Sequence, residues 1–115
     1  IHYTSSTTGF PKGAVWSHQS LVNNARIYCN RKRAGHQSVY ANVMPLFQTA
    51  GCATGVLGCL QAACKMLVLK RLDAGVFARL IEEQRITTCF AALTMLFELL
   101  DLLETIPREI WRRLR

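Results

Sequence analysis

The side chains best suited to chemistry gather near the start of this chain. Hydroxyl side chains run consecutively into a glycine, and a Pro-Lys-Gly sequence follows after one phenylalanine: Thr4, Ser5, Ser6, Thr7, Thr8, Gly9, Phe10, Pro11, Lys12, Gly13. Hydroxyl and backbone N–H groups donate to phosphate oxygens, glycine lets the backbone approach closely, and lysine supplies a compact positive charge. The composition indicates a polyphosphate site, but a solvated Ser/Thr turn has the same composition.

The spacing differs from that of the familiar phosphate loop G-x-x-x-x-G-K-[ST]. Here two residues separate Gly9 from Lys12, and Gly13 follows the lysine. If the segment binds phosphate, its loop differs from the G-x-x-x-x-G-K-[ST] loop.

The order of the residues resembles the signature loop of the adenylate-forming superfamily, which includes acyl-CoA synthetases, luciferases and the adenylation domains of peptide synthetases. That loop usually reads Tyr-Thr-Ser-Gly-Thr-Thr-Gly-x-Pro-Lys-Gly, and this chain departs from it at Ser6. The segment 44–51 resembles the family's Pro-Leu-Phe-His-x-x-Gly motif, with Gln48 in place of histidine. The segment 92–96 resembles Val-Pro-Thr-Met-Leu, with Leu93 in place of proline.

The resemblance implies a two-step reaction. A carboxylic acid of the fatty or aryl class attacks the α-phosphate of ATP, with Mg²⁺ assisting the departure of pyrophosphate. Coenzyme A then takes the acyl group. The resemblance places the β- and γ-phosphates against one loop, made by Thr4, Ser5, Ser6, Thr7, Thr8, Gly9 and Gly13, with Lys12 neutralising their charge. It places Gln48 beside the carboxylate and the α-phosphate, where a glutamine can donate a hydrogen bond but cannot carry a proton-linked positive charge.

The resemblance also implies that residues 1–115 are an interior piece of a larger adenylation domain and are catalytically incomplete alone. The family's later motifs, which hold adenine, ribose, Mg²⁺ and the adenylation lysine, do not occur in this stretch. The departures at Ser6, Gln48 and Leu93 leave a second hypothesis open, a non-catalytic homologue that keeps the fold as an interaction module.

The chain is basic, with a formal net charge of +7 and clusters at 31–33, 70–71 and 112–115. Such clusters can bind nucleic acid or an acidic membrane surface. No aromatic interleaving accompanies them, so we expect solvated helix ends and no nucleic-acid partner, and we leave peripheral membrane contact open. The sequence does not indicate an oligomeric state.

The 5 cysteines are odd in number and form no C-x-x-C pair, which favours free thiols in a reducing compartment such as the cytoplasm. The histidines have no metal-binding spacing. Residues 39–64 carry no charge and are long enough to span a bilayer, but polar residues and glycines within them favour a strand followed by a packed helix.

Strands alternating with helices predict an α/β fold with a largely parallel sheet. Residues 1–3 and 14–16 should be the strands of a hairpin that carries the hydroxyl-rich loop. We expect further strands over 38–44, 65–69 (buried) and 86–90. Helices are expected over 17–30 (capped by Ser17), 51–63, 73–84 (capped by Asp73) and 94–104 (capped by Thr94), with another beginning near Pro107.

Hydrophobic spacing also predicts the core. The apolar stripe of the helix over 73–84 should face inward through Val76, Phe77, Leu80 and Ile81. Aromatic and thioether side chains elsewhere are also expected in the core, namely Phe47, Phe90, Met95 and Phe97. For Phe47 the alternative is a wall of the acyl pocket.

Overall fold

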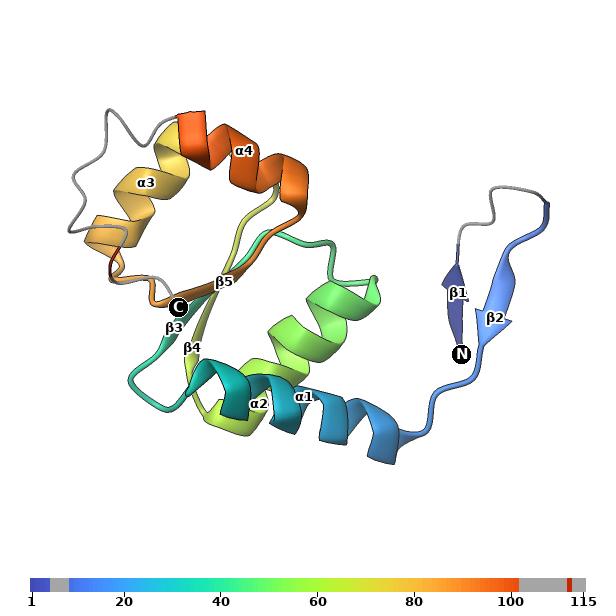
Figure 1. The fold of residues 1–115 in the computed structure, drawn as a ribbon. Helices are drawn as coiled ribbons and strands as arrows, with labels where there is room; N and C mark the ends of the chain where they lie inside the picture. Colours follow the sequence, from blue (N-terminus) through green and yellow to red (C-terminus); the bar gives the residue numbers. More distant parts are fainter. Residues whose placement is uncertain (5–8, 102–111, 113–115) are drawn as a thin grey trace.

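A three-stranded parallel sheet lies between two layers of helices in the computed structural model of the chain, which describes residues 1–4, 9–101 and 112 (Figure 1). The strands are β3 (Val39–Asn42), β4 (Lys65–Val68) and β5 (Thr88–Phe90), in the order β4-β3-β5. In this register Tyr40 of the central strand lies opposite Met66 and Thr88. The predicted α/β class and parallel pairing are confirmed.

The helices cover opposite faces of the sheet because the chain crosses the sheet in both directions. The chain runs from β3 to β4 on one side of it and then back past β3 to β5 on the other side. Connections between parallel strands are right-handed, so crossovers that run in opposite directions place their helices on opposite faces of the sheet. One face is covered by η1 (Ala50–Leu57) and α2 (Gly58–Ala62), which pack against α1 (His18–Lys32). The other is covered by α3 (Ala74–Glu83) and α4 (Leu93–Asp101). Within the described part of the chain, every helix is too short or too polar to cross a bilayer.

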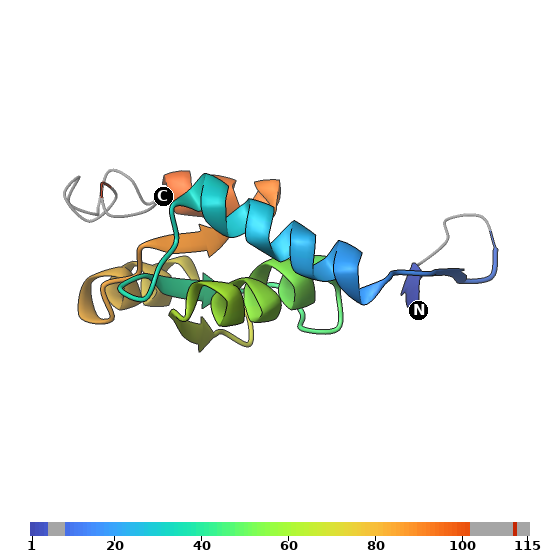
Figure 2. The ribbon, with the colours of Figure 1, turned by 90° about the horizontal axis from the view of Figure 1, so that it is seen from below.

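A separate hairpin precedes this body. Strands β1 (His2–Thr4) and β2 (Lys12–Ala14) pair antiparallel and project beyond the first turn of α1 (Figures 1 and 2). The predicted hairpin is confirmed, but its second strand begins at Lys12 and ends at Ala14. Val15 and Trp16 therefore belong to the connection with α1.

Two predicted helix caps are present. The Ser17 hydroxyl accepts a hydrogen bond from the Ser20 N–H at 3.0 Å, and the Asp73 carboxylate accepts one from the Val76 N–H at 2.9 Å. Each satisfies a backbone donor that the first turn leaves free. Helix α4 begins at Leu93, one residue before its expected cap, so Thr94 lies inside the first turn. Its expected end near Glu104 and the helix expected at Pro107 lie outside the described residues.

Several predicted core positions are wrong. Strand β4 lies at the edge of the sheet and is not buried, and its Val68 is 56% exposed. Phe47 lies in a surface turn and is 81% exposed, and Phe97 on the outer side of α4 is 57% exposed. On α3 the buried stripe is narrower than expected, because Phe77 and Ile81 are buried whereas Val76 is 39% exposed.

The central strand divides the interior into two unlike halves because its side chains alternate between the faces. Toward α3 and α4 it presents Ala41 and Val43, which belong to an apolar core with Phe77, Ile81, Ile86 and Leu99. Toward α1 and η1 it presents the buried side chains of Ser38, Tyr40 and Asn42. The Tyr40 ring meets the Tyr28 ring edge-to-face at 6.4 Å. Only the first half is therefore an ordinary hydrophobic core.

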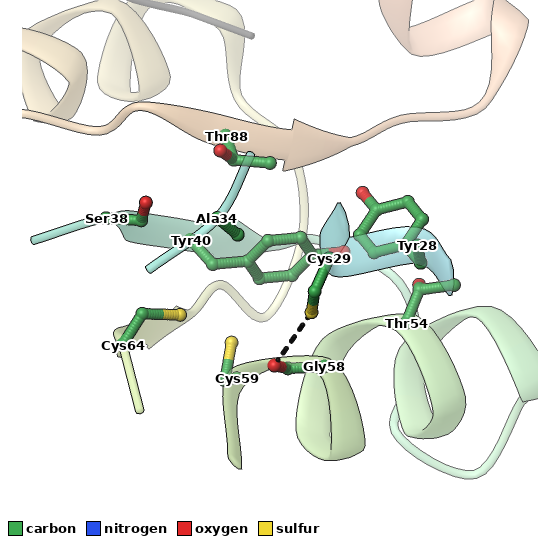
Figure 3. Close-up of a pocket in the computed structure, with 10 residues that line it drawn as sticks. All are labelled: Tyr28, Cys29, Ala34, Ser38, Tyr40, Thr54, Gly58, Cys59, Cys64 and Thr88. Carbon is green, nitrogen blue, oxygen red and sulfur yellow. Dashed lines mark hydrogen bonds between the residues drawn. The ribbon is translucent and has the colours of Figure 1, made fainter. Parts of the chain in front are cut away.

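The second half contains thiols around a cavity of about 10 Å³ (Figure 3). Cys29 Sγ donates to the Gly58 carbonyl oxygen at 3.1 Å, and the Cys64 N–H donates to the Cys59 carbonyl oxygen at 3.1 Å as α2 ends. Burial, reinforced by the neighbouring Cys64, raises the pKa of Cys59 to about 12. Burial likewise raises the pKa of Cys29 and of the Tyr28 hydroxyl. All 5 cysteines are free thiols, as predicted.

This buried thiol predicts how stability depends on pH. The folded-state pKa of Cys59 lies above the unfolded value, so its contribution is complete below pH 8 and is lost as the pH rises toward 12. We expect the free energy of unfolding to fall above pH 9, with Cys59 contributing up to about 1.4 kcal/mol per pH unit. Denaturant titrations from pH 7 to 11 should show a shallower decline in Cys59→Ala. An identical slope in Cys59→Ala and wild type would contradict this assignment.

Candidate functional site

The hairpin fixes both ends of the hydroxyl-rich loop. Thr4 is the last residue of β1 and lies opposite Lys12, the first residue of β2. The Thr4 hydroxyl donates to the Lys12 carbonyl oxygen at 3.3 Å, which adds a side-chain bond where the loop begins and ends. Ser5, Ser6, Thr7 and Thr8 lie outside the described residues. The predicted site residues at either end of the loop are thus brought together.

The remaining described positions of this loop are open to solvent. Gly9, Lys12 and Gly13 are exposed. At Gly13 a Cβ atom would lie 2.9 Å from Ile1 Cγ2 and 3.3 Å from Tyr3 Cε1. A glycine there leaves room for the Tyr3 ring on the opposite strand. Lys12 is exposed, and Gly13 beside it has no side chain to keep a ligand away from the backbone. This combination suits a large anion that approaches from solvent.

Gln48 lies in the turn that leads from β3 to η1. Its N–H donates to the Pro45 carbonyl oxygen at 3.0 Å, and its own carbonyl oxygen accepts from the Cys52 N–H at 2.8 Å. These bonds hold the backbone of the turn, while the Gln48 side chain is exposed. The Gln48 side chain is therefore free to reach into solvent from a fixed backbone.

The helix that follows is a π-helix over its first eight residues, Ala50–Leu57. The predicted helix is confirmed in extent, but its wider first part was not foreseen. Such segments are rare and occur frequently at functional sites. A Cβ atom at Gly51 would lie 2.1 Å from the Pro45 carbonyl oxygen and 2.9 Å from that of Met44. The helix therefore rests directly on the backbone of the second motif.

The hairpin meets this second motif through one polar contact. His2 Nε2 lies 3.2 Å from Thr49 Oγ1, and Thr49 immediately follows Gln48. Beside this contact is a cavity of about 180 Å³, lined by residues of the hairpin end, α1 and η1, among them Trp16, His18 and Cys52. Sequence reasoning missed the His2–Thr49 pair because the two residues lie 47 positions apart and belong to no common motif. It did identify the two segments that the pair joins.

The hairpin and the turn at Gln48 lack the side chains that usually hold a magnesium ion. In the described ranges, no three His, Cys, Asp or Glu side chains gather where they could hold a metal ion. Mg²⁺ is usually held by one or two carboxylates together with substrate phosphates, and neither the hairpin nor the turn at Gln48 contains a carboxylate. The exposed Thr4 and Lys12, at the two ends of the hydroxyl-rich loop, are instead residue types that can donate to phosphate oxygens.

Comparisons with known proteins identify the family of the chain. The sequence profile described as AMP-binding enzyme matches residues 1–112. The chain is 29% identical over 110 residues to a medium-chain fatty-acid–CoA ligase of Escherichia coli, covering 96% of this chain and 19% of the relative. It is 33% identical over 98 residues to a 4-chlorobenzoate–CoA ligase of a Pseudomonas species, covering 84% of this chain and 19% of the relative. The chain thus spans about a fifth of the length of these relatives.

Solved structures share the fold. ATP-bound MatB from Rhodopseudomonas palustris superposes with a TM-score of 0.86 at 27% identity, over 98% of this chain and 22% of that one. A malonyl-CoA ligase in a complex with methylmalonyl-CoA and AMP superposes with a TM-score of 0.84 at 27% identity, over 98% of this chain and 24% of that one.

The contact between η1 and the second motif predicts a large effect of Gly51→Ala. The added methyl group would overlap backbone atoms of Pro45, which cannot move aside like a flexible side chain, so we expect a loss of about 2 kcal/mol or more in the free energy of unfolding. Gly75→Ala is the matched control, because its methyl group would have room in the first turn of α3. Denaturant unfolding should show Gly75→Ala unchanged or stabilised by up to about 1 kcal/mol. Equal stabilities of the two variants would contradict the close contact.

Proposed function

Because the chain belongs to the AMP-binding enzyme family, we propose that its hairpin binds the β- and γ-phosphates of ATP while a carboxylic acid is activated to an acyl-adenylate. The observation that carries the proposal is the pairing of Thr4 with Lys12, which fixes the two ends of the hydroxyl-rich loop. Fixed donors cost no reorganisation when negative charge develops on the departing pyrophosphate, so they stabilise the transition state more than mobile ones.

Each residue of the loop has a role in this proposal. The hydroxyls and backbone between Thr4 and Gly9 donate to phosphate oxygens, and Lys12 neutralises part of their charge. Gly13 keeps the backbone beside Lys12 free of a side chain. Ser6 occupies the position where the family's loop has glycine, and we propose that its backbone or hydroxyl also faces the phosphates.

Gln48 serves the other reactant. In this proposal its amide group donates to the carboxylate or to the α-phosphate and orients them for attack. A glutamine cannot supply positive charge, so orientation is its whole contribution. ATP, when bound, supplies the leaving group, and the departing pyrophosphate carries the charge that the hairpin stabilises.

The finer features of the reaction extend beyond this chain. The relatives are named for a medium-chain fatty acid and for 4-chlorobenzoate as substrates of CoA ligation. We therefore propose a fatty or aryl acid as substrate, coenzyme A as acceptor, Mg²⁺ with the triphosphate, and action within a longer polypeptide. The free thiols fit a reducing compartment such as the cytoplasm. A peripheral membrane contact of the basic clusters stays a secondary proposal.

A non-catalytic homologue is the alternative, and the departures at Ser6, Gln48 and Leu93 favour it. An interaction module would keep the hairpin and the sheet without any need for pyrophosphate chemistry. The exchange of labelled pyrophosphate into ATP by the complete polypeptide separates the two functions, because only an adenylating enzyme catalyses it.

We expect Lys12→Ala to lower the rate of ATP–pyrophosphate exchange by about 100-fold or more, since it removes a charge that stabilises the leaving group. Lys32→Ala is the matched control, because Lys32 is the last residue of α1, at the other end from the hairpin. Exchange should be measured in the complete polypeptide with saturating acid. A Lys12→Ala variant as active as Lys32→Ala would refute a phosphate-binding role.

Replacing Gln48 with histidine should increase the rate of ATP–pyrophosphate exchange. In Gln48→His the imidazolium can carry positive charge near the α-phosphate, so we expect a several-fold higher rate below pH 6.5 and a smaller gain above pH 8. Gln48→Ala should lower the exchange rate roughly tenfold, because the donor that orients the reactants is gone. Rates of Gln48→His and Gln48→Ala that match wild type at every pH would place Gln48 away from the reacting groups.

A further inference from the structure

We propose that His2 and Thr49 are a positioning pair that holds the phosphate-binding hairpin at a fixed place relative to Gln48. The inference rests on the proposed function, in which the hairpin and Gln48 serve the two reactants of one step. Neither residue of the pair touches a reacting atom, so each acts through its neighbour.

The hairpin has little else to hold it to the body. Its two strands pair with each other, and neither joins the parallel sheet. Across the described residues, His2 Nε2 to Thr49 Oγ1 at 3.2 Å is the one hydrogen bond between the hairpin and the body that follows residue 16. Figures 1 and 2 both show the hairpin standing beyond the first turn of α1. Without this bond, the connection through Trp16 and contacts around the adjoining cavity remain to orient it.

Both partners of the bond sit on rigid backbone. His2 opens β1 and is paired with Ala14, while Thr4 closes the same strand two residues later. Thr49 lies between Gln48, whose N–H and carbonyl oxygen are both hydrogen-bonded, and Gly51, which is seated on the Pro45 backbone. A strand advances about 3.3 Å per residue, so the bond lies within about 7 Å of the start of the loop along the chain. Movement at the bond is therefore passed directly to Thr4.

The chemistry of the pair requires only a hydroxyl opposite an imidazole nitrogen. The Thr49 hydroxyl can donate to a bare Nε2 or accept from a protonated one, so the contact is available to every protonation state of the ring. Thr49→Val keeps the shape of the side chain and removes this contact, whereas Thr49→Ser keeps the contact.

The test measures ATP–pyrophosphate exchange in the complete polypeptide. In Thr49→Val we expect kcat to fall about tenfold while KM for ATP changes less than twofold, because the loop still binds phosphate but presents it out of line with the acid. Thr49→Ser should retain wild-type kcat. His2→Phe should lower kcat as much as Thr49→Val does. The double variant should lower kcat no further than either single substitution. Thr54→Val is the matched control, since Thr54 donates to the Ala50 carbonyl oxygen of the same helix and makes no hydrogen bond to the described residues of the hairpin.

A second readout does not depend on catalysis. Residual dipolar couplings of backbone N–H groups report the orientation of the hairpin relative to α1. Thr49→Val should change the couplings of residues 2–4 and 12–14 and leave those of α1 intact, and Thr49→Ser should change neither. If the wild type lacks exchange but Thr49→Val reorients the hairpin, the proposed function fails and the positioning pair stands. Unchanged couplings in Thr49→Val, or additive losses of kcat in the double variant, would overturn the pair.

Discussion

The close approach of η1 to the end of β3 determines where both motifs lie. Two glycines make it possible: Gly51 rests on the Pro45 backbone, and a Cβ atom at Gly55 would lie 3.1 Å from Asn42 Oδ1. A larger residue at position 51 would force the helix away from the sheet because the Pro45 backbone cannot yield, and one at position 55 would crowd the buried Asn42 side chain. The turn between strand and helix is consequently tight, and Gln48 and Thr49 sit at its outer side.

The turn at Gln48 and the hairpin lie at the same end of the molecule. Ligands of open α/β sheets bind beyond the carboxyl ends of the strands, and the turn at Gln48 follows the carboxyl end of β3. The hairpin reaches the same region from a different direction, because it precedes α1, which packs along η1 and α2. Residues from opposite ends of the first half of the chain thereby lie close together at this end of the sheet.

Local rules in the sequence were enough for most of the fold. Ser17 and Asp73 marked helix starts through hydrogen bonds that each makes within its own first turn. Burial depends instead on neighbours that are distant in sequence, so the edge position of β4 could not be predicted from its apolar residues. The π-helical winding over Ala50–Leu57 and the contact of Gly51 with Pro45 are likewise absent from any pattern of hydrophobic residues. For the site, the two motifs were evident in the sequence, whereas the His2–Thr49 contact requires the folded geometry.

The described sheet has two edge strands, β4 and β5, and the β4 edge carries its own protection against pairing with another molecule. Strand β4 has a partner on one side only, and Val68 is exposed on it. An edge of this kind offers a template to which the strand of another molecule can add, and lysines near such an edge oppose that addition by repulsion. Lys65 opens β4, and Lys70 follows it by two residues. Besides any role in binding, these two lysines therefore place positive charge where a second strand would have to add.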